Sequence, residues 1–247
     1  QYESILGTDI WKYNKAVKDK SVGQEAIESV LRQIIQVKVI GKEAAIEKVQ
    51  LETDEKEEAD YRAKTVFDSI PAKDKQTQGI ELKVLSKIFE ENKLAQKMYN
   101  VQMGKLKIDY AANTLSAAKV ELIYQAANAK NKETVKNTMS QILSEVTSSQ
   151  NSFYTVAKNK TQADAIEYVI GNQDSRTNLA KAVVSLKKNQ TSALIEEKDG
   201  FYIAHCIQTN SAALQQQYRN QLVSEKQTES FQKIYKTWSD KFDVKVS

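Results

Sequence analysis

The sequence predicts an α+β protein that is mainly helical, with an inserted unit of the order β-α-α-β-α-β-β. Its 247 residues include one Pro and seven Gly, well below the usual shares of roughly 5% and 7%, and this scarcity favours long helices over a β-sandwich rich in turns. Apolar residues recur at helical spacing towards both ends of the chain and alternate as in strands only in its middle part. With 40% hydrophobic residues, the chain can bury a core.

Three helices are predicted in the first half of the chain. Residues 23–45 carry apolar side chains at positions i, i+3, i+4, i+7 and i+8, which predicts a helix with one buried face, formed by Ile27, Val30, Leu31, Ile34 and Ile35. A second helix is predicted for residues 53–69. Its first turn holds Asp54 and Glu55, which suit the positive end of the helix dipole, and it must end before Pro71.

The stretch that follows, residues 72–79, is polar and is interpreted as a loop. A third helix is predicted for residues 80–103. Its apolar side consists of Val84, Ile88, Leu94, Met98 and Val101.

The middle of the chain predicts strands and shorter helices. Val120, Leu122 and Tyr124 alternate with other residues as in a strand, and the Asp-Gly step at Asp199 and Gly200 indicates a hairpin. The helix over residues 132–148 should turn Val135, Met139, Ile142, Leu143 and Val146 inward. The remaining predictions are helices over 152–160 and 176–186 and strands over 165–171, 191–197 and 201–209.

Helical spacing returns over residues 212–242, and residues 242–246 alternate as a short strand. The two helical flanks are expected to pack together, because neither apolar face can stay open to water. Trp11 and Trp238 are expected to be core anchors where the flanks meet. The domain prediction is therefore a helical domain of residues 1–117 and 211–247 around a second domain of residues 118–210.

Composition excludes several classes of protein. One Cys cannot form an intrachain disulfide, and one His with one Cys cannot build a metal site, so neither a metal nor a cofactor is expected. His205 and Cys206 are neighbours and point to opposite faces of a strand. We interpret His205 as a surface or packed strand residue and Cys206 as a small buried hydrophobe. A net charge of +4 without a basic cluster argues against nucleic-acid binding.

No apolar run reaches the roughly 18 residues of a membrane-spanning helix. The chain begins at Gln1 rather than Met. We therefore expect that an N-terminal segment has been removed, and a signal peptide is one candidate.

Three stretches resemble secreted foldases of the PrsA and SurA type. Residues 27–44 (IESVLRQIIQVKVIGKEA) and 52–59 (ETDEKEEA) are similar to the helix, charged turn and second helix of their chaperone domain. Residues 179–208 (LAKAVVSLKKNQTSALIEEKDGFYIAHCIQ) are similar to a helix and strand pair of parvulin-type prolyl isomerases. The resemblance implies a helical chaperone domain, built from both chain ends, around a parvulin-like domain.

The parvulin pattern is altered at its functional positions. Leu122 and Tyr202 stand where the family has its two His residues, and no counterpart of the Gly-Gly-x-Leu-Gly segment is found near residues 165–171. The degenerate site, or peptide groove, implied by the resemblance comprises Leu122, Asp164, Ser175, Leu179, Val184 and Tyr202. From the residues alone, Leu122 and Tyr202 also fit plain core positions, and Asp164 fits a turn. No catalytic residue is assigned, and the domain is predicted to be inactive.

The resemblance implies an extracytoplasmic chaperone that binds unfolded or secreted client proteins. Relatives from Gram-positive bacteria are lipid-anchored outside the membrane, so the only membrane contact expected is through an anchor that preceded Gln1. Whether the chain forms a homodimer stays open. Two alternatives remain: an active prolyl isomerase with an altered site, and an assembly or structural module of a cell-surface complex.

Overall fold

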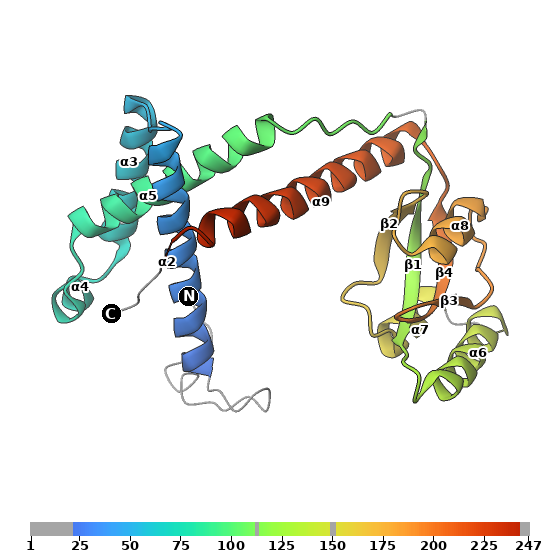
Figure 1. The fold of residues 1–247 in the computed structure, drawn as a ribbon. Coiled ribbons are helices and arrows are strands. Elements are labelled where there is room, and N and C mark those ends of the chain that lie inside the picture. The colour runs from blue at the N-terminus through green and yellow to red at the C-terminus, as the bar shows by residue number, and fades with distance from the viewer. Residues whose placement is uncertain (1–21, 112–113, 149–151, 243–247) are drawn as a thin grey trace. The chain divides into compact units, whose positions relative to one another are not determined.

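The computed structural model describes residues 22–111, 114–148 and 152–242, and the chain divides into two compact units (Figure 1). The first unit comprises Gln1–Lys107 and Gln227–Ser247, and the second comprises Ile108–Lys226. The predicted α+β class and the order β-α-α-β-α-β-β are confirmed. Trp11 and the strand predicted for residues 242–246 lie outside the described residues, apart from Phe242.

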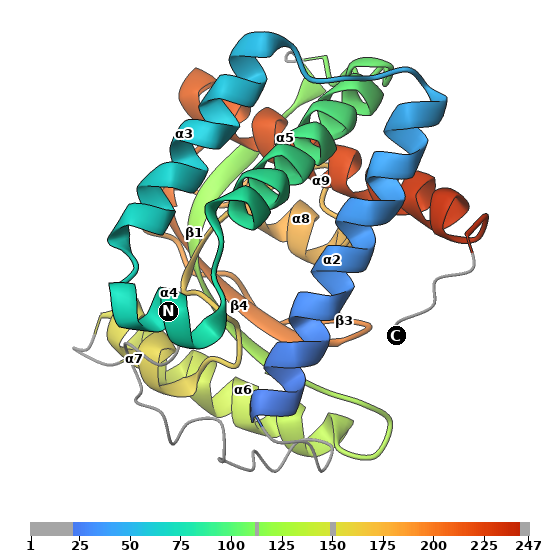
Figure 2. The same ribbon diagram turned by 90° about the vertical axis from the view of Figure 1, so that its left-hand side faces the viewer.

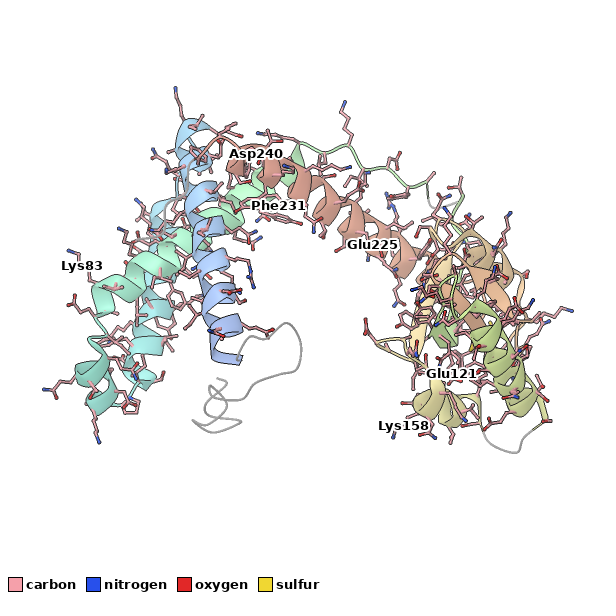
Figure 3. All side chains as sticks on the ribbon, turned by 60° about the horizontal axis from the view of Figure 1, so that its bottom comes forward. Lys83, Glu121, Lys158, Glu225, Phe231 and Asp240 are labelled. Atoms are coloured by element: carbon pink, nitrogen blue, oxygen red, sulfur yellow. The ribbon has the colours of Figure 1, made fainter. Side chains whose placement is uncertain are left out.

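The helical unit contains α2 (Val22–Ile46), α3 (Thr53–Ser69), α4 (Ala72–Gln78), α5 (Leu82–Gly104) and the second half of α9 (Ala212–Ser239). Its core joins the second half of α2 to α5 and α9, through Val39, Ile40, Ala44, Met98 and Trp238. The ring of Phe231, which is labelled on α9 in Figure 3, packs edge-to-face on Tyr99 and Trp238. The prediction that Trp238 is a core anchor is confirmed, because its side chain is only 5% exposed.

Helices α3 and α5 lie side by side (Figure 2). Two small buried residues of α3, Ala59 and Ala63, allow close packing, and Lys97 of α5 forms an ion pair with Glu55 at 2.6 Å. The start of α3 is fixed by a capping box in which Glu52 and Glu55 satisfy each other's backbone N–H groups. The predicted second helix is confirmed with the bounds that the sequence indicated.

The loop predicted for residues 72–79 is wrong, because Ala72–Gln78 form helix α4. Pro71 stands at the N-cap with φ −56°, where its missing N–H costs nothing, and Asp74 lies in the first turn. Gly79 ends the helix with φ 62°, a left-handed conformation that glycine adopts readily. Start and stop signals therefore form a short helix out of a segment without an apolar face.

The buried face predicted for the first helix is wrong in its N-terminal half. The helix itself is confirmed as α2, but Ile27, Val30, Leu31 and Ile34 are 62%, 53%, 36% and 48% exposed. The reason is that α2 contacts α5 and α9 through residues from Ile35 onwards. The predicted third helix is confirmed as α5, but Val84 and Ile88 on its apolar side are also exposed, at 52% and 45%. Apolar spacing identified both helices but not what covers them.

The second unit is built on a four-stranded antiparallel sheet of order β2-β1-β4-β3 (Figure 1). The strands are β1 (Ala117–Ala126), β2 (Glu167–Gly171), β3 (Ile195–Glu197) and β4 (Gly200–Gln208). Strand β3 is shorter than the predicted 191–197. There the hydroxyl of Ser192 accepts the N–H of Ala204, at 3.0 Å, and Thr191 makes an isolated bridge to His205.

Helices cover both faces of this sheet. Helices α6 (Lys132–Ser148) and α7 (Phe153–Lys160) bury one face, and the five predicted inward-facing residues of α6 all belong to this layer or pack against it. Helix α8 (Thr177–Ser185) packs on the other face through Leu179 and Val183. The first half of α9 closes one end of the unit through Tyr218 and Leu222. Among the described helices, none is long and apolar enough to cross a membrane.

Candidate functional site

The strand β4 places Tyr202 on the sheet face that α8 covers. Its ring is 3% exposed and stacks on Tyr124 of β1 with centroids 4.7 Å apart, because the two residues are cross-strand partners. The Tyr202 hydroxyl donates to Asp199 Oδ2 at 2.5 Å, and the Tyr124 hydroxyl donates to the Asp199 carbonyl oxygen at 3.0 Å. The hairpin turn that the sequence indicated at Asp199 therefore supplies the acceptors for both phenols.

An ion pair joins this cluster from the start of α8. Arg176 binds Asp174 through two parallel bonds, Nε–Oδ1 at 2.9 Å and Nη2–Oδ2 at 2.7 Å. Its guanidinium also lies over the Tyr202 ring, 5.6 Å from the centroid, which is within cation–π range. We call Tyr124, Asp174, Arg176, Asp199 and Tyr202 the tyrosine–arginine network.

The tyrosine–arginine network keeps the phenol of Tyr202 protonated. Burial, and then the carboxylate of Asp199, raise the pKa of Tyr202. The bond to Asp174 raises the pKa of Arg176 further above its already high ordinary value. The Tyr202 phenol therefore donates to the Asp199 carboxylate, and the Asp174 carboxylate neutralises the Arg176 guanidinium. These contacts fix the groups of the network relative to one another.

The structure brings together three of the six residues of the predicted degenerate site. Leu122, Leu179 and Tyr202 lie in one buried cluster and are 1%, 0% and 3% exposed. Asp164 and Ser175 are exposed, and Val184 is half-buried and lies outside that cluster. The side chain of Leu122 can make no hydrogen bond, and the buried side chain of Leu179 offers no surface to a ligand.

His205 points away from this cluster, as its distance of three residues from Tyr202 predicted. Its ring stacks on Phe153 of α7 with centroids 5.3 Å apart, and Nδ1 shares a hydrogen bond of 2.9 Å with the Thr191 hydroxyl. Burial lowers the pKa of His205 and raises the pKa of the Cys206 thiol. Cys206 is 0% exposed, so its interpretation as a small buried hydrophobe is confirmed. Within the described residues, no group of three or more His, Cys, Asp or Glu could hold a metal ion.

A cavity of about 540 Å³ lies beside the β3–β4 hairpin. None of the six predicted site residues lies in its wall. Lys132 and Glu196 form an ion pair at 2.6 Å in this wall. The wall is formed by the loop after β1, the starts of α6 and α8, and the β3–β4 hairpin. Its residues are Ala127, Asn128, Ala129, Lys132, Thr177, Asn178, Glu196, Glu197, Lys198 and Phe201.

Glu197 in this wall has a structural task that the sequence did not reveal. Its Oε1 accepts the backbone N–H groups of Asn178 and Leu179 at 2.7 and 2.9 Å. These are unpaired donors at the start of α8, whose N-cap Arg176 makes no side-chain cap bond. A residue 18 or 19 positions away therefore caps the helix, which local capping signals could not indicate.

Glu197→Ala is expected to destabilise the second unit by about 1 kcal/mol, the usual cost of losing a helix cap. The measurement is urea unfolding followed by thiol labelling of Cys206, which is buried in this unit. The matched control is Glu196→Ala, which removes only an ion pair between half-exposed side chains and should destabilise the unit clearly less than Glu197→Ala. Equal effects of the two variants would contradict the capping role.

Comparison with protein families finds a match within the second unit. Residues 115–208 match the family model described as Rotamase: PPIC-type PPIASE domain. No curated protein sequence matches the chain.

Solved structures with a similar fold include an isolated PpiC-type domain, PrsA from Bacillus anthracis and PrsA from Streptococcus pneumoniae. The isolated domain is 20% identical, with 41% of this chain and 98% of that chain covered and a TM-score of 0.35. The Bacillus protein is 15% identical over 88% and 99%, with a TM-score of 0.45. The Streptococcus protein is 14% identical over 90% and 87%, with a TM-score of 0.37.

The family match confirms the parvulin part of the resemblance predicted from the sequence: residues 115–208 are similar to PPIC-type, or parvulin, domains. Helical segments flank these residues on both sides.

Proposed function

We propose that the protein is an extracytoplasmic foldase or chaperone that binds unfolded or partly folded client polypeptides. The observation that carries this proposal is the exposed apolar side of α2. Ile27, Val30, Leu31 and Ile34 follow one another along one side of the helix and are 36% to 62% exposed. We call these four residues the α2 stripe. The client-binding domain in this proposal is the helical one, assigned from the sequence to residues 1–117 and 211–247.

The energetics of the stripe favour weak and general binding. Burying one Ile, Val or Leu side chain fully is worth about 1.5–3 kcal/mol, and each stripe residue still has a third or more of its surface to bury. The attraction is non-directional, so it suits many apolar segments. Val84 and Ile88 of α5 add exposed apolar surface within the same unit.

The second part of the proposal is that the PPIC-type domain lacks isomerase activity. Prolyl isomerisation must lower a barrier of about 18–20 kcal/mol, which calls for an apolar pocket that desolvates the amide and favours its twisted form. The supporting observation is that Leu122, Leu179 and Tyr202 are packed into a buried core. The polar groups nearby are committed to the tyrosine–arginine network.

The location and anchoring belong to the same proposal. An extracytoplasmic position, on the outer face of a Gram-positive cell membrane through a lipid anchor, follows from the resemblance to secreted foldases. If the protein self-associates, the proposal is a homodimer formed through the helical domain.

The double variant Ile27→Ser/Ile34→Ser is expected to lose most of the client protection. With two of four stripe residues made polar, at least fivefold more protein should be needed to suppress the aggregation of chemically denatured rhodanese, followed by light scattering. The fold should persist, since both positions are largely exposed. The matched control is Tyr61→Ser on α3, which is 72% exposed and outside the stripe.

Three results would decide against parts of the proposal. Equal protection by the wild type and the double variant would remove the stripe from client binding. No protection by the wild type, together with one tight partner in a pull-down, would favour the assembly module. A rate of proline isomerisation on a short peptide close to that of a control parvulin would establish the active enzyme instead.

A further inference from the structure

Strand β2 leaves one edge of the sheet open in the second unit. It is the outermost strand beside β1, and its register with β1 is fixed by five residue pairs from Ala117↔Gly171 to Glu121↔Glu167. The bonds Leu122 N–H to Ile166 O and Asn172 N–H to Ser116 O continue this ladder at both ends. Even-numbered residues of β2 therefore bond to β1.

The odd-numbered residues of β2 consequently turn their backbone groups outward. No residue in the described part of the chain bonds to the backbone N–H or C=O of Glu167 or Val169. The side chain of Glu167 is exposed, and Val169 is half-buried. At Gly171 the backbone carbonyl oxygen already accepts the N–H of Asp174, at 3.1 Å, so the open part centres on Glu167 and Val169.

The open edge carries an excess of negative charge. Glu121 of β1, labelled in Figure 3, stands directly opposite Glu167 in a pair whose side chains are close. Within the described residues, only Lys119 forms an ion pair with Glu167, at 2.5 Å. Burial, and then the Glu167 carboxylate, raise the pKa of Glu121. One lysine therefore serves two neighbouring carboxylates, and like charges at this position disfavour the pair.

We propose that the outer edge of β2 takes up an extended segment of client polypeptide as a fifth strand, with a Lys or Arg of that segment beside Glu167. Four backbone bonds, to the N–H and C=O groups of Glu167 and Val169, would hold the segment, in the manner of strand addition to a free edge. A cation opposite Glu167 supplies the charge that the carboxylate pair lacks. This proposal rests on the proposed function, because it names a second contact for the same clients.

The size of the edge argues for a peptide segment rather than a second copy of the chain. A stable protein interface buries about 1,200–2,000 Å², whereas the open part of β2 offers two residues. Weak, repeated contact with extended chains is what such a short edge can support.

The test uses the full chain and an end-capped peptide, Thr-Lys-Val-Lys-Val-Lys-Thr, with amide hydrogen exchange followed by NMR. Saturating peptide should slow the exchange of the Glu167 and Val169 amides at least tenfold, with less effect on Tyr168 and Ile170, which already bond to β1. The same peptide with Glu in place of Lys should bind at least fivefold more weakly, as should the Lys peptide to Glu167→Lys.

Val169→Pro removes the outward N–H and leaves the ladder to β1 intact, since proline is tolerated on an edge whose N–H faces solvent. It should weaken binding at least fivefold, whereas the matched control Val169→Ala, which keeps the N–H, should not. Glu167→Gln removes the charge without changing the backbone, so it tests the proposal even if the proline variant does not fold. It should bind the Lys peptide more weakly than the wild type does.

Absence of protection at Val169, or equal binding by the proline and alanine variants, would overturn the proposal. So would protection of Val169 that rises with protein concentration without peptide, because a second copy would then occupy the edge. If the peptide does not bind at the β2 edge but the wild type still suppresses the aggregation of rhodanese, the proposed chaperone function is unaffected. Edge protection without any rhodanese protection would show a peptide site in a protein that is not a general chaperone.

Discussion

Gly200→Ala is expected to destabilise the second unit by about 3 kcal/mol or more. Gly200 begins β4 with φ 153°, a backbone conformation that side chains rarely permit. A Cβ there would lie 2.1 Å from the carbonyl oxygen of Gln125 and 3.0 Å from the Cα of Ala126. These are backbone atoms of the central strand β1, so the strand pairing itself must shift to make room.

Thiol labelling of Cys206 in increasing urea measures this effect, because the thiol is the only one in the chain and is buried in the second unit. The control is Gly79→Ala in the helical unit, where φ is 62° but nothing lies within 4 Å of the added Cβ. It should cost about 1–2 kcal/mol in its own unit and leave the labelling of Cys206 unchanged. If the urea midpoint for Cys206 labelling were the same in Gly200→Ala as in the wild type, the steric argument would be contradicted.

Element types could largely be predicted from the sequence, because periodicity is a local property. The alternation around Leu122 and the helical spacing around Met139 each identified the right element. Helix α4 could not be found in this way, since its seven residues have no apolar face and depend on Pro71 and Gly79 at their ends. Periodicity also predicted an apolar side on α2 but could not say that its first half would remain uncovered.

The candidate site was predicted only in part, for a related reason. The sequence could indicate that Leu122 and Tyr202 replace the two histidines of the parvulin pattern, which is a statement about aligned positions. It could not indicate that Arg176, Asp199 and Tyr202 meet, because these residues lie on a helix start, a hairpin turn and a strand. Side-chain contacts between separate elements depend on the packed fold and leave no periodic signal.

These contacts give the altered positions a physical role. In this chain the phenol of Tyr202 ties β4 to the hairpin through Asp199, and the guanidinium of Arg176 ties it to the start of α8. Glu197 secures the same helix start from β3. The region where the resemblance places a peptide groove is therefore a junction of β3, β4 and α8 that the network holds fixed.

Leu179→Ala is expected to cost about 2–5 kcal/mol, since the side chain is 0% exposed and its removal leaves a cavity between α8 and the sheet. When the opened unit recloses faster than the thiol is labelled, the labelling rate of Cys206 without denaturant follows the population of the open form. It should therefore accelerate by roughly 30- to 3,000-fold, because each 1.4 kcal/mol corresponds to a factor of ten. The matched control is Val184→Ala on the same helix, which is half-buried and lies outside the cluster, and it should change the rate by less than about tenfold.

The comparison also separates a core position from a groove position. A residue that forms the wall of an open peptide groove would lose little stability on truncation, because water already reaches it. A residue that fills the junction between α8 and the sheet loses the whole burial term together with the cavity term. If Leu179→Ala labels no faster than Val184→Ala, Leu179 belongs to an accessible groove. The case for an inactive domain would then lose its main structural support, and prolyl peptides would become the first ligands to test at that position.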